Sequence, residues 1–283
     1  MAARTSPTER QKRLGAEVRR MRTAAGMSAE YAAGLLGVDR GKISHIESGV
    51  RAISPERVRT LACNCGCEDA DYVDALADMA RPGRRGWWDR YRGSLPQGLL
   101  DIAELEQHSV RMRAAYSMHI PGLLQTSDHA LAVFRVVIPQ LPQHEIALRL
   151  AHRVERQQVL DDEDPTPFVA IVHEAALRMR FGGPDVAREQ LDHLVKRSEE
   201  PNIEIRVIPF EAGAFPGAGQ TVLYAEGPVS QLDTVQVDNS HGPDFLHAEG
   251  QLAKYRAHLD WMENIALAPE ASRDFIAQIA TTF

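Results

Sequence analysis

Glycines and small polar residues between positions 26 and 49 divide this part of the 283-residue chain into short segments. Ser28 and Asp39 are suited to begin helices, because their side-chain oxygens can accept hydrogen bonds from free backbone N–H groups. Gly26 and Gly49 are suited to end helices, and Gly37 allows a tight turn between the two caps. The spacing predicts two short helices joined by a turn containing glycine.

Helices are also predicted on either side of this pair. Apolar residues recur at helical spacing from residue 10 to about 25, and Ser54-Pro55-Glu56 is typical of a helix start. A fifth, acidic helix is predicted at about 70–80. The residues expected on the inner faces of the five helices are Leu14, Val18, Met21, Tyr31, Ala32, Leu35, Leu36, Ile43, Ile46, Val58, Leu61, Ala62, Cys65, Tyr72, Leu76 and Met79.

The third helix, from Asp39 to about Ser48, has a polar outer face. With Ile43 and Ile46 inward, the outward residues are Arg40, Gly41, Lys42, Ser44 and His45. Two short helices joined by a turn within a five-helix unit form the helix-turn-helix arrangement. The alternative is an amphipathic bundle whose charges are merely solvated.

The net charge of −7 is unevenly distributed along the chain. Residues 1–60 hold 12 Lys and Arg against 6 Asp and Glu, whereas residues 93–283 hold 15 against 27. The basic part therefore has a net charge of +6, which favours contact with a polyanion, and the acidic remainder has another task.

The stretch SHIESGVR at residues 44–51 resembles the end of the recognition helix in XRE (Cro/C1-type) DNA-binding domains. The resemblance covers residues 14–62 and implies that the opening of the third helix reads base edges in double-stranded DNA. It assigns base reading to Arg40, Lys42 and His45, with Gly41 allowing close approach. Arg is the strongest reader, because its guanidinium can bond guanine with two hydrogen bonds.

The same resemblance implies supporting roles for other residues. Ser44, Lys42 and Arg51 would contact phosphates, and Arg22 would form a salt bridge with Glu47. Ala29 stands where the family often has a glutamine that contacts DNA.

No motif for catalysis or for a cofactor is found. His173-Glu174 lacks the second histidine of a zinc protease, since Leu177 stands in its place. Cys63, Cys65 and Cys67 offer three thiols without a nearby histidine, so we expect small apolar fillers, with Cys63 more exposed, rather than a metal site. We expect no metal, no cofactor and no enzymatic activity.

The rest of the chain predicts a mixed α/β domain. Helices are expected at about 97–118, at 142–160 with Ile146, Leu150 and Val154 on one face, at 247–266 and at 270–280. Residues 168–210 read as strand, helix and strand, and two more strands are expected near 220–226 and 233–237. The predicted organisation is a helix-turn-helix domain at 1–80, a basic junction at 81–96 that contains Trp87 and Trp88, and a regulatory α/β domain at 97–283.

Several blocks in this half, among them PGLLQT (121–126), EAALR (174–178) and PNIEIRVIPF (201–210), resemble the C-terminal domain of WhiJ-like actinomycete regulators. These proteins join an XRE domain to this domain and are often encoded beside a small acidic partner protein. Some are described as antitoxin-like. His129 replaces the tyrosine that usually follows PGLLQT.

Five polar residues stand inside apolar blocks of this half: Glu106, Gln125, Arg156, Glu174 and Arg178. They could line a ligand or partner pocket, because charged groups among apolar residues need partners. Alternatively, Arg156 or Arg178 pairs with Glu106 or Glu174 to lock helices together.

These observations predict a sequence-specific transcription regulator, with two alternatives. It would be a cytoplasmic homodimer on an inverted repeat, because a single helix-turn-helix reads only a short half-site. A small acidic protein partner would act on the C-terminal domain, and no membrane association is expected. The alternatives are an antitoxin-like protein whose main task is to bind that partner, and a repressor controlled by a small ligand.

Overall fold

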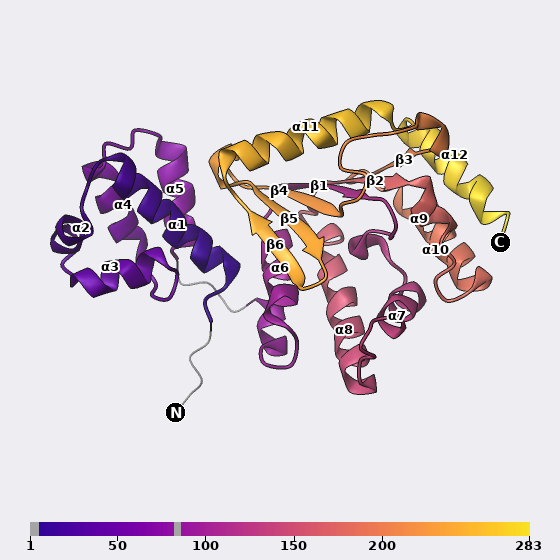
Figure 1. Cartoon of the computed structure of the whole chain (residues 1–283), viewed down its shortest axis with the longest axis horizontal. Coiled ribbons are helices and arrows are strands. Elements are labelled where there is room, and N and C mark those ends of the chain that lie inside the picture. Colours follow the sequence, from indigo (N-terminus) through magenta and orange to yellow (C-terminus); the bar gives the residue numbers. More distant parts are fainter. Residues whose placement is uncertain (1–5, 82–85) are drawn as a thin grey trace. The chain divides into compact units, whose positions relative to one another are not determined.

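The computed structural model describes residues 6–81 and 86–283, and the chain divides into two compact units, Met1–Asp89 and Arg90–Phe283 (Figure 1). The division falls inside the predicted junction at 81–96. The arginine pair of that junction, Arg84 and Arg85, lies outside the described residues, as do residues 1–5.

The described part of the junction contains a 3-10 helix, η1 (Trp87–Tyr91). The rings of Trp87 and Trp88 meet edge to face with their centroids 5.8 Å apart, and Trp88 is buried.

The N-terminal unit is formed by five helices within the described residues: α1 (Glu9–Ala24), α2 (Ala29–Leu35), α3 (Arg40–Glu47), α4 (Pro55–Asn64) and α5 (Ala70–Met79). Ser28, Asp39 and Ser54 each accept a hydrogen bond from a backbone N–H in the first turn of their helix. The predicted helix starts are therefore confirmed. Gly26, Gly37 and Gly49 have φ values of 65°, 62° and 76°, a left-handed conformation that glycine adopts without strain.

The core of this unit has one difference from the prediction. Leu14, Val18, Ile43, Ile46 and most of the other predicted residues are buried, but the side chain of Tyr31 is 63% exposed. Helix α2 has only seven residues, and Ala32, Ala33 and Leu36 form its buried side. Tyr31 lies outside this buried side of the helix.

A buried carboxylate links α1 to α5. Glu17 on α1 is paired with Arg13 and Arg20 on the same helix, at 3.2 Å and 2.6 Å. It also accepts a hydrogen bond from the hydroxyl of Tyr72 on α5. The charge of this acid is thus balanced inside the bundle.

The second unit is built on a six-stranded sheet in the order β3-β2-β1-β4-β5-β6. The strands are β1 (Arg111–Tyr116), β2 (Phe168–His173), β3 (Ile203–Ile208), β4 (Val222–Glu226), β5 (Thr234–Asn239) and β6 (Gly242–Leu246). β1, β2 and β3 run parallel, whereas β1, β4, β5 and β6 pair antiparallel. The pairing is therefore parallel on the β2 side of β1 and antiparallel on its β4 side.

Helices cover both faces of the sheet. The α-helices of this unit are α6 (Gln97–Gln107), α7 (Ser127–Arg135), α8 (Gln143–Arg156), α9 (Glu174–Arg178), α10 (Pro184–Arg197), α11 (Glu249–Ile265) and α12 (Pro269–Ala280), and α7 and α8 pack against each other. Residues of α11 pack on one face, with Ala115 and Tyr224, while residues of α9, α10 and α12 pack on the other, with Met112 and Ala114. Figure 1 shows α11 along one side of the sheet, opposite α6, α7, α8 and α10. The predicted mixed α/β class is confirmed.

Two secondary-structure predictions were wrong in this unit. The helix expected at 97–118 ends at Gln107, and residues 111–116 form β1, the strand at the centre of the sheet. Strand β6 was not predicted. Arg, Met and Ala favour helices in isolation, but pairing with β2 and β4 on both sides overrides that preference. In α8, Ile146 is buried as expected, but Val154 is 45% exposed.

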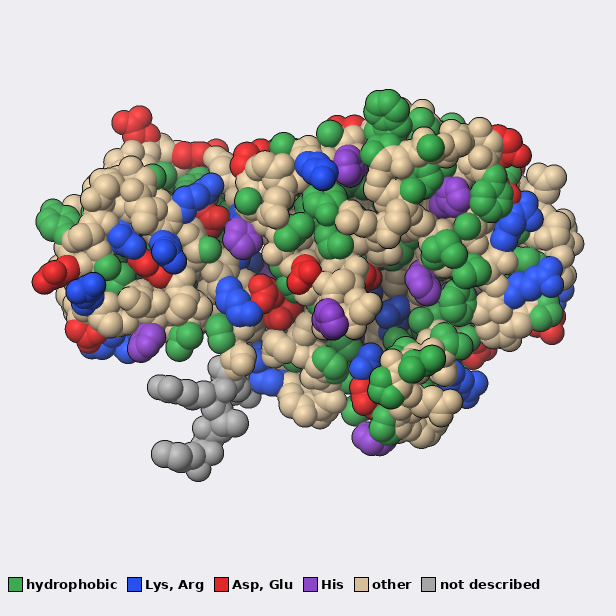
Figure 2. Space-filling view, in the orientation of Figure 1, with side chains coloured by type: hydrophobic (Ala, Val, Ile, Leu, Met, Phe, Trp, Pro, Cys, Tyr) green, Lys and Arg blue, Asp and Glu red, His purple; other side chains and the backbone are tan. Residues whose placement is uncertain are grey.

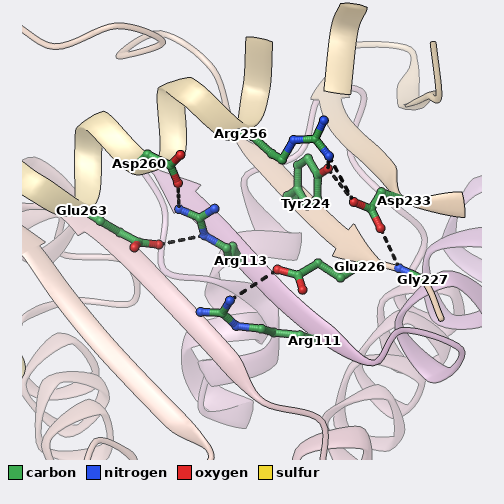
Figure 3. A network of polar contacts seen from close by, with 9 residues as sticks. All are labelled: Arg111, Arg113, Tyr224, Glu226, Gly227, Asp233, Arg256, Asp260 and Glu263. Atoms are coloured by element: carbon green, nitrogen blue, oxygen red, sulfur yellow. Dashed lines mark hydrogen bonds and ion pairs between the residues drawn. The ribbon is translucent and has the colours of Figure 1, made fainter. Parts of the chain in front are cut away.

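A polar network fixes α11 on the sheet (Figure 3). Arg113 of β1 is buried and donates to Asp260 at 2.7 Å and to Glu263 at 2.8 Å, both on α11. Further along, Asp233 accepts hydrogen bonds from the Tyr224 hydroxyl and the Gly227 N–H. The partners are satisfied within the fold, so this network has a structural role.

Candidate nucleic-acid interface and a cavity

The outer face of α3 presents the residues predicted to read DNA. Arg40, Gly41, Ser44 and His45 are exposed and Lys42 is half-buried, while Ile43 and Ile46 are buried beneath them. Among the residues that the structure describes, the side chains of Arg40 and His45 have no hydrogen-bond or ion-pair partner. Their donors and acceptors are thus directed to the solvent.

Lys42 has an intramolecular partner. Its ammonium lies 2.8 Å from Asp39 Oδ2, and its backbone N–H donates to Asp39 Oδ1 at 2.8 Å. These two contacts hold the pKa of Asp39 below its usual value, and the Lys42 ammonium has the larger effect. The Lys42 ammonium has three N–H donors, so a contact with a base or a phosphate would add to this pair or replace it.

The position of α3 is set by close contact with α1. The Arg22 guanidinium lies 2.5 Å from Glu47 Oε1 and 3.1 Å from Glu47 Oε2, which is the predicted pair, and it also donates to the Met27 carbonyl. A Cβ atom on Gly15 would lie 2.5 Å from the Ile46 carbonyl oxygen. Only glycine permits the two helices to approach this closely.

Two further residues were predicted to contact phosphates. Ser44 is exposed in its middle, and Arg51 is exposed just beyond its end, where the Arg51 N–H donates to the His45 carbonyl at 3.0 Å. Figure 2 shows several Lys and Arg side chains on the N-terminal unit, interspersed with acidic ones.

In the second unit, three of the five predicted pocket residues line one cavity of about 250 Å³: Glu106, Gln125 and Arg156. The cavity adjoins the carboxyl end of β1, between α6 and α8. Its remaining lining residues are Leu99, Ile102, Tyr116, His119, Ile120, Gly122, Val133, Arg153, Thr221, Gln236 and Asp238. Several of these, above all Arg153, were missed. No sequence signal singled out Arg153, because its block is rich in charged residues.

Charge and burial define the base of this cavity. Arg156 Nε lies 3.1 Å from Glu106 Oε2, and the two side chains are 8% and 3% exposed. Burial raises the pKa of Glu106 to about 7, although Arg156 opposes the shift. Burial also lowers the pKa of Arg153 to about 9, and neighbouring Arg156 adds to this effect.

The other two predicted residues are placed elsewhere. Arg178 Nε donates to Glu174 Oε1 at 2.6 Å within α9, and Glu174 Oε2 accepts the Phe210 N–H. Glu174 and Arg178 therefore stabilise the end of β2 and do not line the cavity. Arg156, by contrast, joins α8 to Glu106 of α6.

The three cysteines are free thiols. Cys63 is exposed, and Cys65 and Cys67 are half-buried. Burial raises the pKa of Cys65. Residues 6–81 and 86–283 contain no group of three or more His, Cys, Asp or Glu placed to hold a metal ion. In the same ranges, no helix combines the length and the apolar character needed to cross a membrane.

Family models match both units. A model of a helix-turn-helix domain matches residues 13–76, which include all of α2, α3 and α4. A model described as a domain of unknown function, DUF5753, matches residues 99–278. The chain belongs to the DUF5753 family. Its DUF5753 domain contains the whole sheet and the residues that line the cavity. No curated protein and no solved structure matches the chain.

Proposed function

We propose that this DUF5753 protein is a sequence-specific transcription regulator that binds double-stranded DNA through α3. The helix-turn-helix domain indicates a DNA-binding regulator. The observation that carries the proposal is the outer face of α3, where Arg40 and His45 are exposed beside Gly41, the residue without a side chain. A helix with this face fits the major groove, and Gly41 allows the backbone to approach the base edges.

The contacts divide into reading and positioning. Arg40, Lys42 and His45 read base edges. Ser44 and Arg51 hold phosphates and set the register of α3 in the groove. Arg22 and Glu47 keep α3 at a fixed angle to α1.

We further propose that the regulator is a cytoplasmic homodimer of the XRE type on an inverted repeat, and that it is not an enzyme. Two copies are needed because one recognition helix covers only a short half-site. A small acidic protein partner acts on the DUF5753 domain. This last point rests on the resemblance to WhiJ-like regulators, in which such partners are often encoded nearby.

Selection of binding sites from a random DNA pool, followed by a mobility-shift titration with the full chain at physiological salt, tests the proposal. We expect one enriched inverted repeat, bound at least about 10³-fold more tightly than unrelated DNA. Equal affinity for all sequences would refute specific reading. Enrichment of a single half-site, with one copy bound, would refute the homodimer but not sequence-specific binding. Affinity capture of the full chain from its native cells tests whether a small acidic protein binds it. Recovery of further copies of this chain and of no other protein would refute the partner.

A further inference from the structure

The cavity in the DUF5753 domain lies where the sheet changes direction. Tyr116 ends β1, which pairs parallel with β2 and antiparallel with β4. The crevice beyond the carboxyl end of such a strand is a common place for ligands. His119 and Asp238 are exposed, whereas Glu106 and Arg156 are buried, so the cavity leads from the surface to a buried base.

Polar groups at the base are left unsatisfied. Glu106 Oε2 and Arg156 Nε lie at ion-pair distance, but neither has a well-directed hydrogen bond within the described part of the chain. Buried polar atoms without partners are rare and costly, and they mark positions where another group binds. Gly122 leaves room for the guanidinium groups, since a Cβ there would lie 2.5 Å from Arg156 Nη2 and 2.9 Å from Arg153 Nη1.

The charges at the base are not balanced. Glu106 offsets Arg156, but Arg153 donates to a neutral acceptor, Gln125 Oε1, at 2.5 Å. No carboxylate of residues 6–81 and 86–283 forms an ion pair with Arg153. Asp238 on the rim is exposed and accepts a hydrogen bond from Gln236, and both it and Glu106 attract Arg153 without a direct ion pair. One guanidinium is therefore available for an anion.

The opposite wall is apolar. Leu99 and Ile102 of α6, Ile120 and Val133 line the same space. A group that combines a carboxylate with a short hydrocarbon part would satisfy both sides, with the charge on Arg153 and the hydrocarbon on α6. An inorganic dianion would leave the apolar wall uncovered and would lie near Glu106, which disfavours a second negative charge.

We propose that this cavity binds a small organic carboxylate, with Arg153 as the principal ligand of the carboxylate group. Gln125 orients Arg153, and Arg156 completes the polar base with Glu106. The proposal stands apart from DNA reading, because it concerns residues of the DUF5753 domain alone.

Calorimetric titration of the full chain with benzoate tests the proposal. Benzoate carries a carboxylate on a compact apolar ring and suits a cavity of about 250 Å³. We expect saturable binding of one benzoate per chain, and no binding of neutral benzamide, which has the same shape. Inorganic phosphate is the third probe, and we expect it to bind more weakly than benzoate.

Two variants locate the site. Arg153→Met should weaken benzoate binding at least about tenfold, since a charge-assisted bond is lost. Arg149→Met is the matched control, because Arg149 lies one turn earlier on α8 and is already paired with Glu145 at 2.6 Å. It should bind benzoate as the wild type does.

Four outcomes would overturn the proposal: no benzoate binding, equal binding of benzamide, phosphate binding more tightly than benzoate, or unchanged affinity in Arg153→Met. The comparison of probes uses the wild-type protein and stays decisive if Arg153→Met does not fold. DNA affinity is measured separately, so failure here leaves the proposed DNA reading unaffected.

Discussion

The Tyr72 hydroxyl donates a hydrogen bond of 2.6 Å to Glu17 Oε2 and so joins the last helix of the N-terminal unit to the first. Both side chains are buried, and Arg20 contacts both of them, at 3.1 Å from the hydroxyl and 2.6 Å from the carboxylate. Burial raises the pKa of Tyr72, so the hydroxyl remains a donor. The helix-turn-helix is thus closed by a fifth helix through a polar contact.

Tyr72→Phe removes this donor. We expect the free energy of unfolding to fall by about 1.5–3 kcal/mol, because the hydrogen bond is made to a charged group. Urea unfolding of the full chain measures the change in the transition of the N-terminal unit. Tyr31→Phe is the control, since Tyr31 is 63% exposed, and should change stability by less than about 0.5 kcal/mol. Equal effects of the two variants would contradict the prediction.

Gly15→Ala tests the close contact between α1 and α3. The new methyl group would overlap the Ile46 carbonyl, so we expect a loss of about 1–3 kcal/mol and weaker DNA binding as α3 is displaced. Gly34→Ala on α2 is the matched control. Its methyl group would meet nothing within 4 Å, and the gain in helix propensity should stabilise the unit by about 0.5–1 kcal/mol. Thermal unfolding of the two variants distinguishes the expected loss of stability in Gly15→Ala from the expected gain in Gly34→Ala.

Arg40→Ala tests direct reading. We expect a loss of about 1–3 kcal/mol of discrimination at one base pair of the selected site, with smaller effects at the others. Mobility-shift titrations with every single-base variant of that site measure it. Arg59→Ala removes the same charge from α4, where Arg59 pairs with Asp74, and should leave the base preference unchanged. A uniform loss over all sequences in Arg40→Ala would mean a phosphate contact instead.

Glu106 predicts a pH-dependent stability. Its pKa rises from 4.5 to about 7 in the folded chain, so the native state holds this proton more tightly than the unfolded state. The contribution of protonated Glu106 to the free energy of unfolding is therefore fully present below about pH 4.5, and it is lost as the pH rises through 7. Relative to Glu106→Gln, the wild type should lose up to about 3 kcal/mol between these values. Urea unfolding at a series of pH values checks this. A difference that does not vary with pH would contradict it.

His129 predicts the opposite dependence. Its side chain is 1% exposed, neither ring nitrogen has a hydrogen-bond partner among the described residues, and burial lowers its pKa to about 4. The unfolded state binds the His129 proton more tightly than the folded state. The contribution of neutral His129 to the free energy of unfolding is therefore fully present above about pH 6.5 and is lost as the pH falls through 4. His129→Phe should remove this loss and leave stability at pH 7 unchanged or higher. Thermal unfolding at pH 7 and pH 5 measures both effects.

The N-terminal unit could be predicted because its signals are local. Ser28, Asp39 and Ser54 act within four residues of their own position, so caps and periodicity sufficed for all five helices. The outward face of α3 followed from Ile43 and Ile46. Tyr31 was misplaced because a helix of two turns is too short for its periodicity to define which side faces the core.

The second unit depends on contacts between distant segments. β1 has a helix-favouring composition and becomes a strand only between β2 and β4. The cavity unites α6, α8 and β5, so its composition could not be obtained from spacing along the chain. Glu106 and Arg156 could be predicted because they are polar residues within apolar blocks. Arg153 could not be predicted in this way, because its block is rich in charged residues.

The pairing of β1 with β4 has a consequence for the order of folding. Arg111 and Glu226 lie opposite each other in the sheet although 115 residues separate them in the chain. During synthesis, the N-terminal unit leaves the ribosome before β4 does, and domains generally fold as units from the N-terminus. Until then, β1 has one free edge and a row of unpaired backbone groups. We therefore expect the N-terminal unit to fold first and the sheet that holds the cavity to close later.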